Sequence, residues 1–154
     1  MTGIVIRAAC CADWPTIAEF NCRLAWESEE KRLDPAKIEP GVQAVLQDPA
    51  KGRYFVAEAD GQVVGQLMYT MEWSDWRNGQ IWWLQSVYVA AEYRQQGVFR
   101  QLFEHLVALG IEERVLGVRL YVEKENERAQ RTYQQLGLAQ PGYHVMERWF
   151  GPAL

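Results

Sequence analysis

The stretch EYRQQGVFRQLF has a composition that could bind phosphate. The preceding run WWLQSVYV (82–89) predicts a strand, and the spacing of Leu102, Phe103 and Leu106 predicts a helix that begins near Gly97. A helix N-terminus offers backbone N–H groups and a positive dipole end to an anion, and glycine allows close approach. Arg94 adds positive charge. The alternative is a plain turn whose glycine relieves a positive φ.

A second chemical pattern lies in NERAQRTYQQLGL, which predicts a helix with Gly137 as its C-cap. At about 100° per residue, Asn126 and Tyr133 return to within about 20° of one helix face, with the small Ala129 on the same stripe. One polar amide, one small residue and one phenol then form a stripe on this helix face. The alternative is a tyrosine that packs its ring and leaves its hydroxyl in water.

Together the two patterns resemble the GNAT superfamily of acyl-CoA-dependent N-acetyltransferases. The turn from Arg94 follows the family pattern Q/R-x-x-G-x-G/A through Gly97, with Phe99 where Gly or Ala is usual. Residues 82–137 carry the specific part of the resemblance, and the expected element order extends it over nearly the whole chain. The resemblance implies that acetyl-CoA, the cosubstrate, lies between a fourth and a fifth strand that splay apart.

The resemblance also implies a role for each residue. Strand backbone would pair with the pantetheine arm, the amides of residues 95–100 would hold the pyrophosphate, and Asn126 would contact the arm. Tyr133 would protonate the departing thiolate, since a tyrosine pKa of about 10 is near the thiol value of about 8.5. The implied cofactor-binding residues are Val87, Tyr88, Val89, Arg94, Gln95, Gln96, Gly97, Val98, Phe99, Arg100, Asn126 and Tyr133.

A general base is harder to find. The attacking amine must be neutral, and an amine of pKa ~10.4 is only about 0.04% neutral at pH 7. The family often has a carboxylate on the fourth strand, but this one carries Gln85 and Ser86 instead. Glu72, near the end of the third strand, is the predicted base, with Asp75 as the second candidate. A solvated glutamate at a strand end is the alternative.

Aromatic and acidic residues cluster where an acceptor could bind. Trp73, Trp76, Trp82 and Trp83 either brace the predicted hairpin or line an acceptor pocket. The acidic run 27–30 either attracts a cationic amine or is a solvated surface.

The elements that position these residues follow from periodicity and turn signals. Asp13 and Pro15 open a first helix, and Asp60-Gly61 and Asn78-Gly79 predict two hairpin turns. The pattern predicts a single mixed α/β domain over residues 1–154, with a mostly antiparallel sheet and the order β-α-α-β-β-β-α-β-α-β. The predicted strands are 4–9, three runs within 53–89, 118–122 and 144–150, and the predicted helices are 14–27, 35–47, 97–113 and 126–137.

Composition and charge exclude several classes of function. The chain has 154 residues, 49% of them hydrophobic, which is enough for one core. A net charge of -4 with no basic run argues against binding to nucleic acids or anionic membranes. The cysteines, Cys10, Cys11 and Cys22, match neither a disulfide framework nor a zinc pattern, so no metal is expected. No signal peptide or span of ~20 apolar residues is evident, so the expected location is the cytoplasm.

Three function classes remain. The first is an enzyme that acetylates a small-molecule or peptide amine, with a homodimer left open. The second is a non-catalytic acyl-CoA-binding or regulatory module of the same fold. The third is a generic phosphate-binding α/β domain, which would leave Tyr133 unexplained.

Overall fold

The computed structural model describes residues 3–152. These fall into two compact units with the boundary after Tyr121. The single domain over residues 1–154 therefore stays a prediction.

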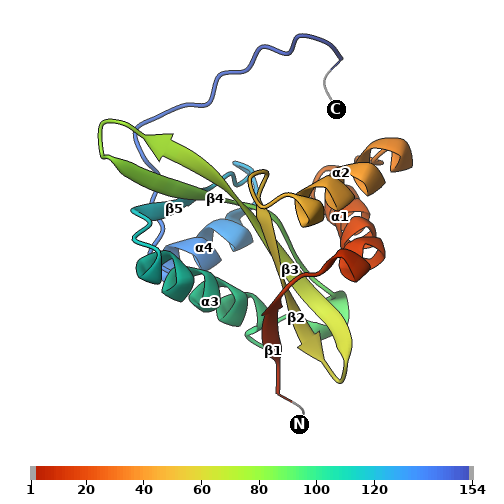
Figure 1. The fold of residues 1–154 in the computed structure, drawn as a ribbon. Helices are drawn as coiled ribbons and strands as arrows, with labels where there is room; N and C mark the ends of the chain where they lie inside the picture. The colour runs from red at the N-terminus through yellow and green to blue at the C-terminus, as the bar shows by residue number, and fades with distance from the viewer. Residues whose placement is uncertain (1–2, 153–154) are drawn as a thin grey trace. The chain divides into compact units, whose positions relative to one another are not determined.

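The first unit is built on a five-stranded mixed sheet in the order β1-β2-β3-β4-β5 (Figure 1). β1 to β4 are antiparallel to their neighbours, and β5 runs parallel to β4. The mixed α/β class with a mostly antiparallel sheet is confirmed. The strands are β1 (Val5–Ala8), β2 (Arg53–Ala59), β3 (Gln62–Ser74), β4 (Gly79–Val89) and β5 (Gly117–Leu120).

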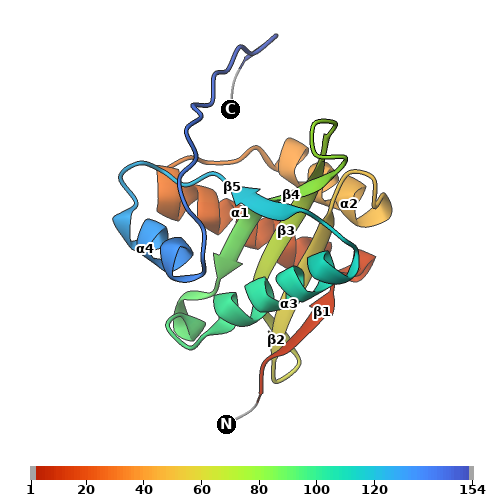
Figure 2. The ribbon, with the colours of Figure 1, turned by 90° about the vertical axis from the view of Figure 1, so that its left-hand side faces the viewer.

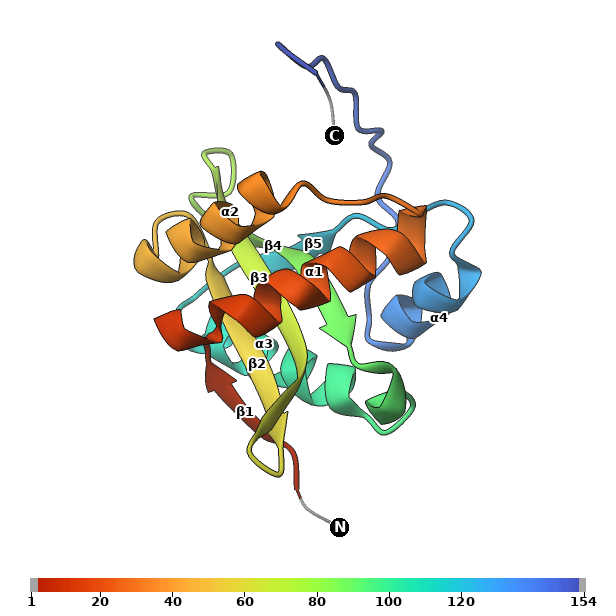
Figure 3. The same ribbon diagram turned by 90° about the vertical axis from the view of Figure 1, so that its right-hand side faces the viewer.

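Helices cover both faces of this sheet. α1 (Trp14–Glu29) and α2 (Pro35–Gln47) lie on one face, as Figure 3 shows, and pack on Tyr54, Val56 and Met68. α3 (Val98–Glu112) crosses the other face (Figure 2), where Gly110 lies against the Trp82 ring. Two short 3₁₀ helices, η1 (Cys11–Asp13) and η2 (Ala91–Tyr93), precede α1 and α3. The α2 bounds match the predicted helix.

The two hairpin predictions had different outcomes. Asp60 and Gly61 join β2 to β3 with φ values of 52° and 75°, as a two-residue turn of this kind requires. The loop between β3 and β4 spans residues 75–78, however, and Gly79 already pairs with Ser74. A Cβ on Gly79 would lie 2.7 Å from the Leu116 side chain. This glycine therefore makes room for Leu116. The second hairpin is confirmed, with Asn78 in its turn at a φ of 51°, but Gly79 belongs to β4 and not to the turn.

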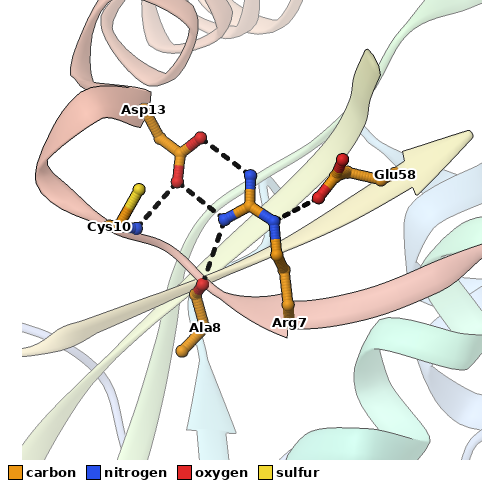
Figure 4. A network of polar contacts seen from close by, with 5 residues as sticks. All are labelled: Arg7, Ala8, Cys10, Asp13 and Glu58. Atoms are coloured by element: carbon orange, nitrogen blue, oxygen red, sulfur yellow. Dashed lines mark hydrogen bonds and ion pairs between the residues drawn. The ribbon is translucent and has the colours of Figure 1, made fainter. Parts of the chain in front are cut away.

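Asp13 lies at the predicted N-cap of α1, but its side chain does not cap the helix. Its carboxylate accepts bonds of 2.8 and 2.9 Å from the Arg7 guanidinium and one of 2.7 Å from the Cys10 N–H (Figure 4). Arg7 also binds Glu58 on β2. The cluster thus ties β1 and β2 to the start of α1.

We expect this cluster to make stability depend on pH. Hydrogen bonds from Arg7 lower the pKa of Asp13 from its ordinary 3.8 to about 2, and the carboxylate side chain is only 10% exposed. Because the folded pKa lies below the unfolded one, the contribution is fully present above about pH 4 and is lost as the pH falls toward 2. Urea unfolding should show a loss of about 2 kcal/mol over this window.

Other carboxyl groups titrate in the same range, so Asp13→Asn is the matched control. The variant should be less stable at pH 5 and should approach the wild-type stability near pH 2. Parallel stability curves for the two proteins would contradict the assignment to Asp13.

The second unit contains α4 (Glu127–Gln135). Asn126 caps it, because its side-chain oxygen accepts a 3.1 Å bond from the Ala129 N–H, and Gly137 follows its end with a φ of 92°. The strand predicted over 144–150 was wrong: none of these residues is paired, and Met146 and Phe150 are more than 90% exposed. Their apolar residues fall in adjacent pairs rather than alternating, and a strand without a partner is not stable.

Candidate active site

The centre of the candidate site is a β-bulge in β4. Met68 of β3 pairs with Gln85, but Gln66 pairs with Tyr88, so Leu67 faces both Ser86 and Val87. Ser86 has a φ of 53°, a left-handed conformation that is uncommon outside glycine. Such a bulge bends a strand and re-aims its backbone groups.

Past this point β4 separates from β5. The parallel pairing joins Ile81–Leu84 to Gly117–Leu120 and ends there, while β4 continues to Val89 (Figure 2). Among the residues described, no strand therefore pairs with residues 85–89 on the β5 side. β5 ends with this pairing, and the unpaired end of β4 lies where the splay between the fourth and fifth strands was predicted.

The open end of β4 leads into the glycine turn. Gly97 is the N-cap residue of α3, with a φ of 79°, and a Cβ built on it would meet nothing within 4 Å. Gln95 is also left-handed, with a φ of 63°. The first turn of α3 presents N–H groups that have no intrahelical acceptor. Both readings of Gly97 thus have support: the turn needs a positive φ, and its outer side is open.

Arg94 holds this turn in place. Its Nε donates 2.9 Å to the Val89 carbonyl, and its guanidinium forms bonds of 3.0 and 3.1 Å with the Glu27 carboxylate of α1. The guanidinium also lies 5.3 Å from the Tyr88 ring centroid. Through these contacts Arg94 anchors the turn to β4 and α1. Glu27, from the acidic run 27–30, is a partner that no local pattern indicated.

The other predicted turn residues divide between core and surface. Val98 is 2% exposed and packs toward Gly65, and Phe99 contacts Phe103 with ring centroids 5.9 Å apart. The Gln96 side chain donates 2.9 Å to the Glu92 carbonyl, while Gln95 and Arg100 are exposed.

The β4 residues Val87, Tyr88 and Val89 were expected to face the pantetheine arm with their backbone. The Tyr88 ring packs on Phe20 of α1, and burial raises its pKa, with the Glu27 carboxylate raising it further. The Ala90 N–H donates to the Val64 carbonyl of β3. Because backbone groups alternate in direction along a strand, the N–H and carbonyl of Val89 point to the open side of β4, where the Val89 carbonyl accepts from Arg94.

The predicted base, Glu72, forms a cluster on the α1/α2 face. One carboxylate oxygen accepts 3.0 Å from the Trp83 indole N–H, and the other accepts 2.9 Å from Arg119 of β5. The Trp83 ring also contacts Tyr121, at 4.7 Å between centroids. Both carboxylate oxygens of Glu72 thus accept a hydrogen bond within this cluster. Asp75 lies in the hairpin loop, where its carboxylate accepts from the Trp76 N–H.

The aromatic hairpin has a mixed role. Trp82 is 1% exposed and stacks on Tyr69, at 3.9 Å between centroids, so it belongs to the core. Trp73 and Trp76 are exposed, at 62% and 89%. Bracing of the sheet is therefore observed for Trp82 alone among these three.

The second unit carries the remaining predicted residues. Asn126 holds the first turn of α4, so its side-chain oxygen already has a structural role. Tyr133 is half-buried, and burial raises its pKa above the ordinary value of 10. Its phenol is therefore protonated at neutral pH, as an acid must be.

Sequence reasoning missed the residues that shape the bulge. Gln66 is fully buried, and its Nε2 donates 3.1 Å to the Ser86 carbonyl. The available signal was a glutamine within the otherwise apolar run VVGQLMY. In residues 3–152, no group of three or more His, Cys, Asp or Glu is placed to hold a metal ion, and no helix is long and apolar enough to cross a membrane.

Comparisons with known proteins all find acetyltransferases. Residues 14–138 match the acetyltransferase (GNAT) family. A possible acetyltransferase from Clostridium difficile 630 has 46% identity and a TM-score of 0.91, over 97% of this chain and 99% of its own. A predicted acetyltransferase from Clostridium acetobutylicum, solved with acetyl-CoA, shares the fold at 14% identity and a TM-score of 0.78, over 95% and 96% of the two chains.

One curated relative is similar over a shorter stretch. Thialysine N-epsilon-acetyltransferase from Bos taurus is 32% identical over 75 residues, or 49% of this chain. The match spans 44% of the bovine protein, less than half of its length.

Proposed function

Since this chain belongs to the acetyltransferase (GNAT) family, we propose that it moves an acetyl group from acetyl-CoA directly to a primary amine. One observation carries the proposal: the stretch of β4 that has lost β5 as a partner leads directly into the N-terminus of α3. An extended ligand arm can pair with such an open strand, and a phosphate group can bind such a helix end.

The residues of the first unit fit the two ends of acetyl-CoA. The pantetheine arm carries amides that can pair with backbone groups on the open side of residues 85–89, apart from the Val89 carbonyl, which accepts from Arg94. The open space outside Gly97 lets a pyrophosphate approach the first turn of α3, and the exposed Arg100 adds a positive charge there.

The proposed transfer is a direct substitution. The neutral amine nitrogen attacks the thioester carbon, and the electron pair of the carbonyl bond moves to its oxygen, where β4 backbone N–H groups stabilise it. The carbon–sulfur bond then breaks, and the proposal gives Tyr133 the role of protonating the thiolate. The proton lost by the amine passes to Glu72 or to water.

The acceptor is proposed to be a small molecule or peptide with a primary amine. The bovine relative is named for the ε-amine of thialysine, so thialysine and lysine come first in an acceptor screen. The screen measures free CoA released from acetyl-CoA. Binding of acetyl-CoA with no CoA release from any amine would favour the non-catalytic acyl-CoA-binding module instead.

Acetyl-CoA should protect the fold. A ligand at 100 times its Kd adds about 2.7 kcal/mol to the free energy of unfolding, which thermal melts detect as a higher Tm. An acetylated pantetheine fragment without the nucleotide should give a smaller shift, because it lacks the pyrophosphate. An unchanged Tm with millimolar acetyl-CoA would refute the assignment of the cosubstrate.

A further inference from the structure

A chain of buried polar side chains links α1 to the β4 bulge. Asn21 of α1 donates 3.2 Å from its Nδ2 to the Tyr54 hydroxyl. Gln66 of β3 donates from its Nε2 to the Asn21 Oδ1 at 3.5 Å and to the Ser86 carbonyl at 3.1 Å. All three side chains are at most 5% exposed, so the chain lies inside the core on the α1/α2 face.

Gln66 is a costly residue at this position. Its side-chain oxygen is buried and has no hydrogen-bond partner among the residues described. A buried polar atom without a partner destabilises a fold, whereas the other end of the same amide supplies the donor for the Asn21 oxygen and the Ser86 carbonyl. The glutamine therefore leaves one atom unpaired at the position where it holds the Ser86 carbonyl.

The hydrogen bond to Ser86 has a directional consequence. The Ser86 carbonyl and the Val87 N–H belong to one planar trans peptide unit, so they point in opposite directions. A bond that holds the carbonyl toward Gln66 therefore directs the Val87 N–H away from Gln66. The residue that carries this carbonyl has a positive φ, which serine rarely adopts.

We propose that Gln66 is a positioning residue for acetyl transfer: it holds the Ser86 carbonyl so that the Val87 N–H donates to the thioester carbonyl oxygen of bound acetyl-CoA. Asn21 fixes the Gln66 amide from the other side. The proposal rests on the proposed function, because it needs acetyl-CoA along β4. It assigns the oxyanion donor to one peptide unit and its orientation to a side chain that does not touch the substrate.

Gln66→Leu removes the donor and the unpaired oxygen together. Because the Asn21 Oδ1 and the Ser86 carbonyl lose this donor, the variant should be less stable and should unfold at a lower urea concentration than the wild type. The folded variant should still bind acetyl-CoA within about twofold. Its kcat should fall by at least about tenfold, since loss of a whole oxyanion donor costs about 10²- to 10³-fold. Gln66→Met is the second variant, in case leucine does not fit the site. Met68→Leu, a volume-conserving change on the same face of β3, is the matched control and should keep its kcat.

A spectroscopic measurement tests the proposal without an acceptor. Infrared spectra of acetyl-CoA labelled with ¹³C at the thioester carbonyl report the hydrogen bond directly, because such a bond lowers the stretching frequency. Bound to wild type and to Met68→Leu, the band should shift down from its position in free acetyl-CoA, and Gln66→Leu and Gln66→Met should lose most of the shift. An unchanged band and an unchanged kcat in folded Gln66 variants would overturn the role of Gln66. Failure of the wild type to bind acetyl-CoA would instead refute the proposed function.

Discussion

We expect Tyr133→Phe to lower kcat by about 10²- to 10⁴-fold, the usual contribution of a general acid. The variant keeps the aromatic ring and loses only the hydroxyl, so the Kd for acetyl-CoA should stay within about twofold. This combination follows because proton donation acts in the transition state and not on the bound ground state. The measurements are kcat with the acceptor found by the screen and a calorimetric Kd.

The pH dependence sharpens this test. Burial raises the pKa of Tyr133, so the wild-type acid stays protonated to a higher pH than a free tyrosine. Tyr143, which is 74% exposed, offers a matched control, and Tyr143→Phe should leave kcat unchanged. A Tyr133→Phe variant within twofold of wild-type kcat, with chemistry limiting the rate, would assign the proton to water. Equal losses in affinity and turnover would make the hydroxyl a binding contact.

The second large effect is expected at Gly97. Gly97→Val should weaken acetyl-CoA binding by about 10- to 100-fold, the equivalent of one or two charge-assisted hydrogen bonds to the pyrophosphate. It should also cost about 1–2 kcal/mol of stability, because a β-branched residue must adopt a φ of 79°. Calorimetry and urea unfolding measure the two effects separately.

Gly97→Asn separates the steric effect from the backbone effect. Asparagine tolerates the left-handed region, so this variant should lose little stability, yet its side chain extends into the same open space as that of valine. We therefore expect weaker binding in both variants and lower stability only in Gly97→Val. Wild-type affinity in Gly97→Asn would show that Gly97 serves the turn alone.

Local signals predicted the parts of the fold that local chemistry determines. Pro35 at the start of α2, the Asp60-Gly61 turn and Gly137 after α4 each restrict the backbone within a few residues, and the structure confirms all three. The strand over 144–150 failed because pairing requires a partner, which short-range sequence cannot supply. Gly79 was misread because its neighbour, Leu116, is 37 residues away in the sequence.

In the candidate site, too, features with a local signal were predicted and features that depend on distant residues were not. The turn around Gly97 and the end of α4 at Asn126 were predicted as elements because each has a helix-terminal signature. The bulge at Ser86 was not predicted, since its conformation depends on the register against Gln66 across the hairpin. The partners of Arg94 and Glu72 come from other elements, so no spacing along the chain could indicate them.

The early end of the β4–β5 pairing leaves a strand edge that could favour self-association. A strand with unpaired backbone groups is a template for any other extended chain, and proteins usually protect such edges with charge, prolines or a covering loop. Residues 85–89 contain no charge and no proline. In the proposed complex the pantetheine arm would occupy this edge, so the cosubstrate would also shield the enzyme from self-association. Its cellular supply would then influence solubility as well as turnover.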